Sequence, residues 1–353
     1  MSSRPYAEPV SFPAVDRVLR AYAGTDFTGA VARVEHRGCL VFERAYGITR
    51  EDGGRQAVYV DTRFDLASLT KLVVATAVLQ MVAQGRIALD ESLVRWLPEW
   101  ADRPQERITV RSLLAHQSGM HSGADYRLLL DENVVRYALE RELLATPGER
   151  VIYSDLGFIT LGVLLERVAG RTLAALAGDL LASPTLGFRP PFSRRSAIPA
   201  TEDDGWRGRV QGVVHDEKAY LMGGVAGHAG LFGTAGDVAR LTDIYLAPLS
   251  GRACTPLLTP ELVREATREQ ASDPVLRRGL GWALKTSDEN SCGPAFASAS
   301  FGHTGFVGTC VWADPTRDVQ GVLLTNAVYF GRSDTRDIRS AFYAALLEDL
   351  GLR

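Results

Sequence analysis

Ser68-Leu69-Thr70-Lys71 opens the most apolar helical stretch of the chain, which continues as LVVATAVLQMV over residues 72–82. That stretch is apolar almost all round, which predicts a buried helix, and Gly85 supplies an end signal for it. Residues three apart share one face of a helix, so we expect Ser68 and Lys71 to be neighbours. A lysine at the head of a buried helix is costly unless it is paired or functional.

Ser68 and Lys71 have the chemistry of a nucleophile and its base. Desolvation lowers the pKa of a lysine towards neutrality, which turns the amine into a usable proton acceptor. A serine beside such an amine is an activated nucleophile, and the positive end of the helix would stabilise an oxyanion. The alternative is that Ser68 caps the helix and Lys71 reaches solvent. The S-x-x-K pattern alone is a weak signal, so partners elsewhere in the chain must decide.

Composition narrows the class of protein. The chain has 353 residues, of which 46% are hydrophobic and 23% charged, as in ordinary soluble globular proteins. A formal net charge of -3 is too small to indicate a nucleic-acid or anionic-membrane partner. No run of 18 or more apolar residues predicts a membrane span.

The start of the chain and its cysteines bear on location. Residues 1–9 lack the apolar core of a signal peptide, so we expect a cytoplasmic protein, with a secreted form that has lost its leader left open. The four cysteines are scattered, with no C-x-x-C pair, so neither a zinc site nor a disulfide framework is indicated. They are Cys39, Cys254, Cys292 and Cys310.

The order of elements predicts an α/β (α+β) fold. Two apolar runs near the N-terminus read as a hairpin, and four short strands return late in the chain, before a closing helix. Strands at both ends with helices between them predict one antiparallel sheet built from both termini, with a large, mostly helical insertion. We expect a sheet domain of residues 1–64 plus 275–353, a helical domain of residues 65–274, and an active site in the cleft between them. The predicted elements are helices at 14–23, 72–82, 108–114, 156–168 and 334–350, strands at 29–35, 39–46, 281–285, 298–303, 308–313 and 319–325, and loops at 190–191 and 200–212.

Two further motifs complete a pattern with Ser68 and Lys71. Tyr153-Ser154-Asp155 precedes a predicted helix, and His303-Thr304-Gly305 follows a predicted strand. The order S-x-x-K, Y-S-x and basic-T-G resembles the serine β-lactamase and penicillin-binding-protein superfamily. The tyrosine points to its class C branch, which includes class C β-lactamases, D-alanyl-D-alanine peptidases, D-aminopeptidases and esterases. The segments 97–99, 113–119 and 223–232 are also similar to that family, which implies the class C β-lactamase-like fold.

The resemblance implies a role for each motif residue. Ser68 would be the nucleophile, Lys71 its base, and Tyr153 a second proton carrier near the leaving group, where neighbouring positive charge favours its phenolate. The backbone N–H groups of Ser68 and Phe306 would form the oxyanion hole. The residues expected to contact the substrate are Asp155, His303, Thr304 and Gly305.

Two residues depart from the family pattern. His303 stands where β-lactamases usually carry lysine, and a neutral imidazole holds a substrate carboxylate less firmly. Asp155 stands where asparagine is usual; it would repel an anionic substrate, or it would pair with Lys71 and weaken that lysine as a base. Both changes argue against efficient β-lactam hydrolysis and favour a neutral ester, or an amide whose amine end faces Asp155.

The remaining histidine motifs are expected to support the site from outside it. His116 is predicted to be structural. The segment His215-Asp216-Glu217 would be a hydrogen-bonded brace or a substrate-side contact, and it resembles a segment of a subgroup that includes cell-wall amidases. A metal pair of this segment with His228 is a further alternative, but no metal-ligand spacing supports it, so no metal is expected. His228, among glycines, is predicted to serve backbone packing near the site.

The sequence therefore predicts a serine hydrolase that acts through an acyl-enzyme on a small ester, amide or peptide, with D-amino-acid or cell-wall peptide derivatives among the candidates. A true β-lactamase and a non-catalytic muropeptide- or penicillin-binding protein remain as alternatives. No cofactor, nucleic acid or membrane partner is implied, and the oligomeric state is open. Substrate choice would depend on the loops at 119–126 and 189–217, because specificity on a shared fold is set by loop shape.

Overall fold

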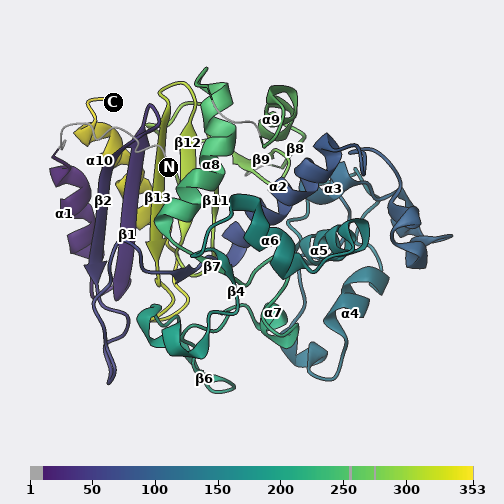
Figure 1. Cartoon of the computed structure of the whole chain (residues 1–353), viewed down its shortest axis with the longest axis horizontal. Helices are drawn as coiled ribbons and strands as arrows, with labels where there is room; N and C mark the ends of the chain where they lie inside the picture. The colour runs from purple at the N-terminus through teal and green to yellow at the C-terminus, as the bar shows by residue number, and fades with distance from the viewer. Residues whose placement is uncertain (1–10, 254–256, 274–275, 353) are drawn as a thin grey trace.

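The computed structural model describes residues 11–253, 257–273 and 276–352, and Figure 1 shows their arrangement. An eight-stranded antiparallel sheet joins the two ends of the chain in the order β2-β1-β13-β12-β11-β10-β9-β8. β1 pairs with β13 from Ala30 opposite Thr325 to His36 opposite Val319. The predicted sheet built from both termini is therefore confirmed. Its strands are β1 Gly29–His36, β2 Cys39–Gly47, β8 Ala271–Ser272, β9 Arg277–Arg278, β10 Ala283–Leu284, β11 Phe301–Thr304, β12 Cys310–Asp314 and β13 Val319–Thr325.

Alternate residues of the strands face two separate cores. Val31 of β1 belongs to one buried cluster, whereas its neighbours Ala30 and Ala32 belong to another, as the two-residue period of a strand requires. Helix α8 (Ala235–Leu249) covers the first face, and α1 (Pro13–Tyr22) and α10 (Arg336–Asp349) cover the second (Figure 1). The sheet is therefore a middle layer between helices.

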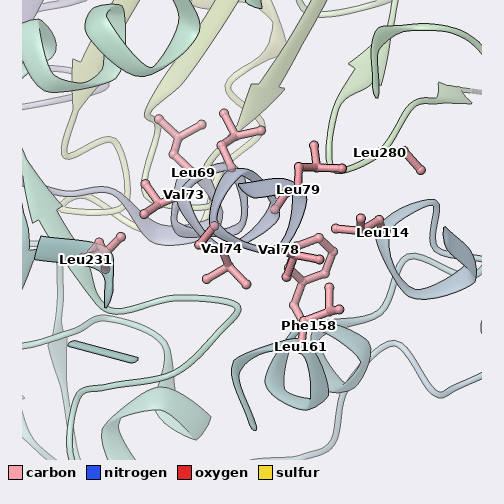
Figure 2. Close-up of a cluster of buried hydrophobic side chains, with 14 of the residues drawn as sticks. Leu69, Val73, Val74, Val78, Leu79, Leu114, Phe158, Leu161, Leu231 and Leu280 are labelled. Atoms are coloured by element: carbon pink, nitrogen blue, oxygen red, sulfur yellow. The ribbon is translucent and has the colours of Figure 1, made fainter. Parts of the chain in front are cut away.

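The helical region gathers around α2 (Thr70–Ala83), which is buried on nearly every side. Figure 2 shows Val73, Val74 and Val78 of this helix among leucines from other elements and Phe158 of α5. Gly85 has φ +66° and follows the last turn, so the predicted helix and its end are both confirmed. The other helices here are α3 Val110–Leu114, α4 Val134–Glu140, α5 Asp155–Ala169, α6 Leu173–Leu181, α7 Glu217–Leu221 and α9 Pro260–Thr267. Short 3-10 helices are η1 Ala67–Leu69, η2 Leu93–Arg95, η3 Pro98–Trp100, η4 Pro104–Arg107, η5 Tyr126–Leu129 and η6 Phe192–Ala197.

Short strands differ from the prediction. β11 begins at Phe301 rather than at Ser298, because Ser300 closes a turn by donating its N–H to Ala297 O (2.9 Å). β10 begins after Gly281, whose φ of +84° is outside the strand region. The mostly helical segment also holds a three-stranded sheet that was not predicted, and the expected loop at 200–212 holds a two-stranded hairpin. These strands are β3 Phe64–Asp65, β4 Gly187–Phe188, β7 Leu231–Gly233, β5 Asp203–Asp204 and β6 Gly208–Arg209.

The predicted division into two domains stays a prediction. Two elements of the segment 65–274 nevertheless belong to the sheet layer: α8 packs on β1, β12 and β13, and β8 forms the edge of the sheet. Cys39, Cys292 and Cys310 are free thiols, and Cys254 lies outside the described residues. No helix in the described part of the chain is long and apolar enough to cross a bilayer.

Candidate active site

A constrained turn places Ser68 at the head of α2. Ala67 has φ +46°, a left-handed conformation that is unfavourable for a residue with a side chain. The buried carboxylate of Asp65 holds this turn: one oxygen accepts from Ala67 N–H (2.8 Å) and the other from His215 N–H (2.7 Å). Ser68 thus lies in η1, immediately before α2, and its position is fixed by the backbone on both sides of the turn.

The ammonium of Lys71 is fully buried and contacts three acceptors. It donates to Ser68 Oγ (3.0 Å) and His228 O (3.2 Å), and it lies 2.9 Å from Asp155 Oδ1. The predicted contact between Ser68 and Lys71 is confirmed. Burial alone would lower the pKa of Lys71, but the charge of Asp155 and the nearby Tyr153 outweigh it and hold the pKa above its ordinary value. The expectation that burial makes Lys71 a neutral base is therefore wrong, and the alternative pairing with Asp155 is correct.

Tyr153 is held against a neutral histidine. Its ring lies 4.4 Å from the ring centre of His116 and 4.9 Å from Lys71 Nζ. His116 Nδ1 accepts from Ser154 N–H (3.0 Å), which fixes the backbone beside Tyr153 and leaves the proton on Nε2. Burial, together with the charges of Arg278 and Lys71, lowers the pKa of His116 well below its ordinary value. The contacts of His116 fit the structural role that the sequence predicted, and the structure adds that this role is to hold the backbone and ring of Tyr153.

A buried row of alternating charges continues from Lys71. Lys218 Nζ lies 3.3 Å from Asp155 Oδ2 and donates to Asp216 Oδ2 (3.0 Å), and Asp216 Oδ1 accepts from His228 Nε2 (2.8 Å). Burial opposes the charged carboxylates, but Lys71 for Asp155 and His228 for Asp216 lower both pKa values. Asp155 is thus neutralised by two ammonium groups. The two ammonium groups compensate its negative charge, which weakens both the expected repulsion of anions and the expected attraction of an amine, and a contact between Asp155 and the substrate stays a prediction.

Asp155, Asp216 and His228 also offer three ligand atoms within 4.8 Å of one another. The residues do not fit a metal ion, because Lys218 Nζ already contacts both carboxylates and supplies the positive charge there. His228 does more than the predicted backbone packing: its carbonyl positions Lys71 and its ring positions Asp216. The predicted brace is confirmed for Asp216, which also caps α7 by accepting from Ala219 N–H (2.8 Å).

The His303 strand lies beside these groups. The His303 ring centre is 6.2 Å from that of Tyr153, and burial, with the charges of Lys71 and Arg278, lowers the pKa of His303 to about 3. Its Nδ1–H donates to Thr304 O (2.8 Å), so Nε2 is an unprotonated acceptor. The predicted neutral imidazole is confirmed.

The strand then turns sharply at Gly305. A Cβ on Gly305 would lie 2.1 Å from Thr309 Oγ1 and 2.9 Å from Leu66 O, so only glycine fits beside the turn that carries Ser68. Phe306 is exposed, and its ring stacks on His215 at 5.6 Å. The predicted oxyanion hole from the N–H groups of Ser68 and Phe306 stays a prediction.

Two hollows flank this cluster. A cavity of about 300 Å³ is lined by Tyr153, His303 and Thr304, together with arginines from β9 and α10. A wider hollow of about 650 Å³ lies beside Lys218 and is lined by parts of both loops expected to govern specificity, including the stacked rings of Tyr126 and Trp206. Parts of both loops therefore border the hollow beside Lys218, and their role in substrate choice stays a prediction.

The structure brings most of the predicted residues together, with some exceptions. Glu217 pairs with Arg332 (2.6 Å). His215 donates its backbone N–H to Asp65, and its Nε2 lies 3.1 Å from Glu202. Sequence reasoning missed Lys218, although it directly follows the His215-Asp216-Glu217 segment and lies in the first turn of α7. It also missed Arg278 and Asp65, for which no local motif gives a signal.

The fold and this serine–lysine–tyrosine arrangement define a class of protein. The chain matches the family described as Beta-lactamase over residues 15–346 and belongs to that family. It is a serine hydrolase of the β-lactamase and penicillin-binding-protein superfamily.

Two characterised relatives and one solved structure are similar to this chain over most of its length. The chain is 32% identical over 355 residues to the N-acetylmuramyl-L-alanine amidase of Bacillus subtilis (strain 168), an alignment that covers 88% of this chain and 80% of the relative. It is 32% identical over 370 residues to esterase EstB of Burkholderia gladioli, with 90% and 91% covered. A class C β-lactamase structure from Rhodobacter sphaeroides matches with a TM-score of 0.76 at 18% identity, covering 96% of this chain and 99% of that one. This last likeness shows the shared fold alone.

Proposed function

We propose that Ser68 forms an acyl-enzyme with small esters or amides, and that Tyr153 carries the proton while Lys71 stays charged. The observation that carries this proposal is the position of Lys71 Nζ, which donates to Ser68 Oγ, pairs with Asp155 and lies 4.9 Å from the Tyr153 ring centre. A charged ammonium orients the serine oxygen but cannot itself accept the serine proton, so we assign that proton to the oxygen of Tyr153.

The proposed reaction has two stages, acylation of Ser68 and hydrolysis of the acyl-enzyme. Ser68 Oγ attacks the carbonyl carbon and its proton passes to the Tyr153 oxygen, while the N–H groups of Ser68 and Phe306 bind the oxyanion. The bond from carbonyl carbon to the leaving oxygen or nitrogen then breaks, and Tyr153 gives its proton to that atom. A water molecule attacks the acyl-enzyme, loses its proton to Tyr153, and the proton returns to Ser68 Oγ as the acid leaves.

The substrates we propose are small esters and amides, with D-amino-acid and cell-wall peptide derivatives as the amide candidates. Two relatives at 32% identity support both bond types, because one is named an esterase and the other an amidase. We expect slow cleavage of β-lactams, since the neutral His303 lacks the positive charge of the usual lysine.

A panel of substrates tests the proposal. It contains a short-chain p-nitrophenyl ester, a D-alanyl p-nitroanilide, a muramyl peptide and a chromogenic cephalosporin, each given to wild type, Ser68→Ala and Ser333→Ala. Ser333 is an exposed serine on a loop and serves as the matched control. We expect ester or amide turnover that is lost in Ser68→Ala and kept in Ser333→Ala. Turnover that survives in Ser68→Ala, or folded wild type that cleaves nothing, would contradict the proposal and favour a binding role.

A further inference from the structure

A further hollow, of about 470 Å³, shares no lining residue with the two that flank the active-site cluster. Its volume lies within the range of about 300 to 1,000 Å³ that is typical of small-molecule sites. Val213, Val214 and Phe232 give it an apolar part, and Arg189 and Arg195 give it positive charge. No aspartate or glutamate of the described chain lines it, so the charge of the two arginines is not balanced within the lining.

Neither arginine of this lining forms an ion pair in the described part of the chain. Arg189 donates through Nε to Gly223 O (2.5 Å), and Arg195 donates through Nε to Pro190 O (3.3 Å). These single bonds orient each guanidinium and leave its terminal N–H groups without an acceptor among the described residues. Such N–H groups match the two oxygens of a carboxylate.

The backbone fixes the position of Arg189. Arg189 itself has φ +52°, a left-handed conformation that is unfavourable for a residue with a side chain and that is found at ligand sites. Gly223 has φ +72°, and a Cβ there would lie only 3.0 Å from Arg189 Nη2. Glycine therefore lets the guanidinium lie against the backbone, where it is in place before a ligand binds.

Three successive backbone donors of the same lining are also unpaired. The N–H groups of Gly212, Val213 and Val214 reach no acceptor among the described residues, whereas the next residue, His215, donates to Asp65. Gly212 and Val214 are buried, and buried N–H groups nearly always have an acceptor, so these need one from outside the chain. Gly212 has φ +61°, and successive N–H groups around such a residue form anion-binding concavities.

We propose that this hollow is a second ligand site, which binds a small carboxylate with an apolar body. The guanidinium groups of Arg189 and Arg195 supply the positive charge, and the N–H groups of residues 212–214 donate to the carboxylate oxygens. The apolar body lies against Phe232 and the valine side chains. The positive charge favours a carboxylate over water as the missing acceptor, because charged hydrogen bonds are the stronger ones.

Two compounds with the same apolar body test the need for charge. 3-Phenylpropionate carries a carboxylate where 3-phenylpropan-1-ol carries a neutral hydroxyl, and neither contains an ester or amide bond. The result is therefore independent of the proposed hydrolase function. In isothermal titration of the whole chain, we expect wild type to bind 3-phenylpropionate at least about 10-fold more tightly than the alcohol, as for charged hydrogen bonds. Wild type that binds neither compound, or both equally, would overturn the proposal.

Removal of the two charges locates the binding. Arg189→Met/Arg195→Met should lower the affinity for 3-phenylpropionate by about 10- to 100-fold and change that for the alcohol by less than about threefold. Arg194→Met is the matched control, because Arg194 is exposed, precedes Arg195 in η6 and is absent from the lining. It should bind as wild type does. Unchanged affinity in the double variant, as for a carboxylate held at the reaction centre, or an equal loss in Arg194→Met would overturn the proposal.

A variant that fills the hollow gives a second test that leaves both arginines in place. Val213→Phe puts a larger side chain at a half-buried position of the lining. We expect it to lose the binding of 3-phenylpropionate while it stays folded, as checked by thermal unfolding without ligand. This variant also decides the question if the double arginine variant does not fold. Wild-type affinity in folded Val213→Phe would show that the carboxylate binds elsewhere and would overturn the proposal.

Discussion

At Lys71, a single contact with a carboxylate reverses the effect of burial on the pKa of the ammonium group. Asp155, 2.9 Å away, keeps the ammonium charged where desolvation alone would neutralise it. Asp155→Asn keeps the shape but removes the charge, so the pKa of Lys71 falls. Since the proposed mechanism needs charged Lys71, we expect kcat/KM at neutral pH to fall about 10-fold or more, and the alkaline limb of its pH profile to move to lower pH. A pH profile of ester hydrolysis measures both.

The matched control for that change is Asp179→Asn, which removes a surface carboxylate paired with Arg171. It should leave the profile unchanged, because exposed ion pairs contribute little. An alkaline limb that stays in place in Asp155→Asn would show that Lys71 is not held charged by Asp155.

His303 links stability to pH. Burial lowers its pKa from the ordinary 6.5 to about 3, so the unfolded chain binds a proton between these values and the folded protein does not. The stabilisation is therefore fully present above pH 6.5 and is lost as the pH falls towards 3. We expect the free energy of unfolding to decrease less steeply over this range in His303→Gln than in wild type, as measured by urea denaturation. Identical slopes would contradict a buried, neutral His303.

At the residue scale, the sequence predicted contacts that follow from local spacing. Ser68 and Lys71 meet because they are one helical turn apart, and the pairing of Asp155 with Lys71 was one of two stated alternatives. Arg278 was not predicted, because the ring that it lies over, that of Tyr153, belongs to a distant segment. Lys218 was not predicted although Asp216 is two positions away, because its second partner, Asp155, comes from another part of the chain. The contact between Lys71 and His228 likewise joins residues 157 positions apart, and no local pattern encodes it.

Among the elements, α5 and the glycine-rich segment before β7 approach unusually closely. A Cβ on Gly227 would lie 1.9 Å from Phe158 O, so glycine alone lets His228 reach Lys71. Gly227→Ala should therefore destabilise the protein by about 2 kcal/mol and lower activity together with it. Thermal unfolding and ester hydrolysis measure the two effects.

Gly178→Ala is the control for that glycine. Gly178 lies in α6 with open space around it, so alanine there should be neutral or stabilising by up to about 1 kcal/mol. A Gly227→Ala protein as stable and active as wild type would show that the close approach to α5 is not required.

Long, periodic elements were predicted well, and short ones were not. β13 spans the predicted residues 319–325, and α5 (Asp155–Ala169) contains the predicted helix 156–168 and is followed by Gly170, whose φ is +66°. The two-residue strands β9 and β10 depend on pairing with neighbours in the sheet rather than on their own pattern. That dependence explains why Arg278, which lies on one of them, escaped the sequence reasoning.

At the scale of the whole molecule, hydrogen bonds join α1 and α10, the first and last helices of the described chain. Asp349 at the end of α10 accepts from Ala14 N–H (3.0 Å) and Val15 N–H (2.9 Å), which are otherwise unpaired donors of the first turn of α1. Asp349→Ala should lower the free energy of unfolding by about 1 kcal/mol, as for the loss of a helix cap, with kcat/KM unchanged. Urea denaturation and ester hydrolysis check this. A loss of activity at full stability would contradict a purely structural role for this layer.

The acyl-enzyme is the central claim, and intact-mass spectrometry tests it most directly. Wild type, Ser68→Ala and Ser333→Ala would be mixed with a slowly hydrolysed p-nitrophenyl ester, quenched in acid and digested for site mapping. We predict that wild type and Ser333→Ala gain the mass of one acyl group on the peptide that contains Ser68, and that Ser68→Ala gains none. An acyl group on another residue, or ester turnover in Ser68→Ala at the wild-type rate, would contradict the account.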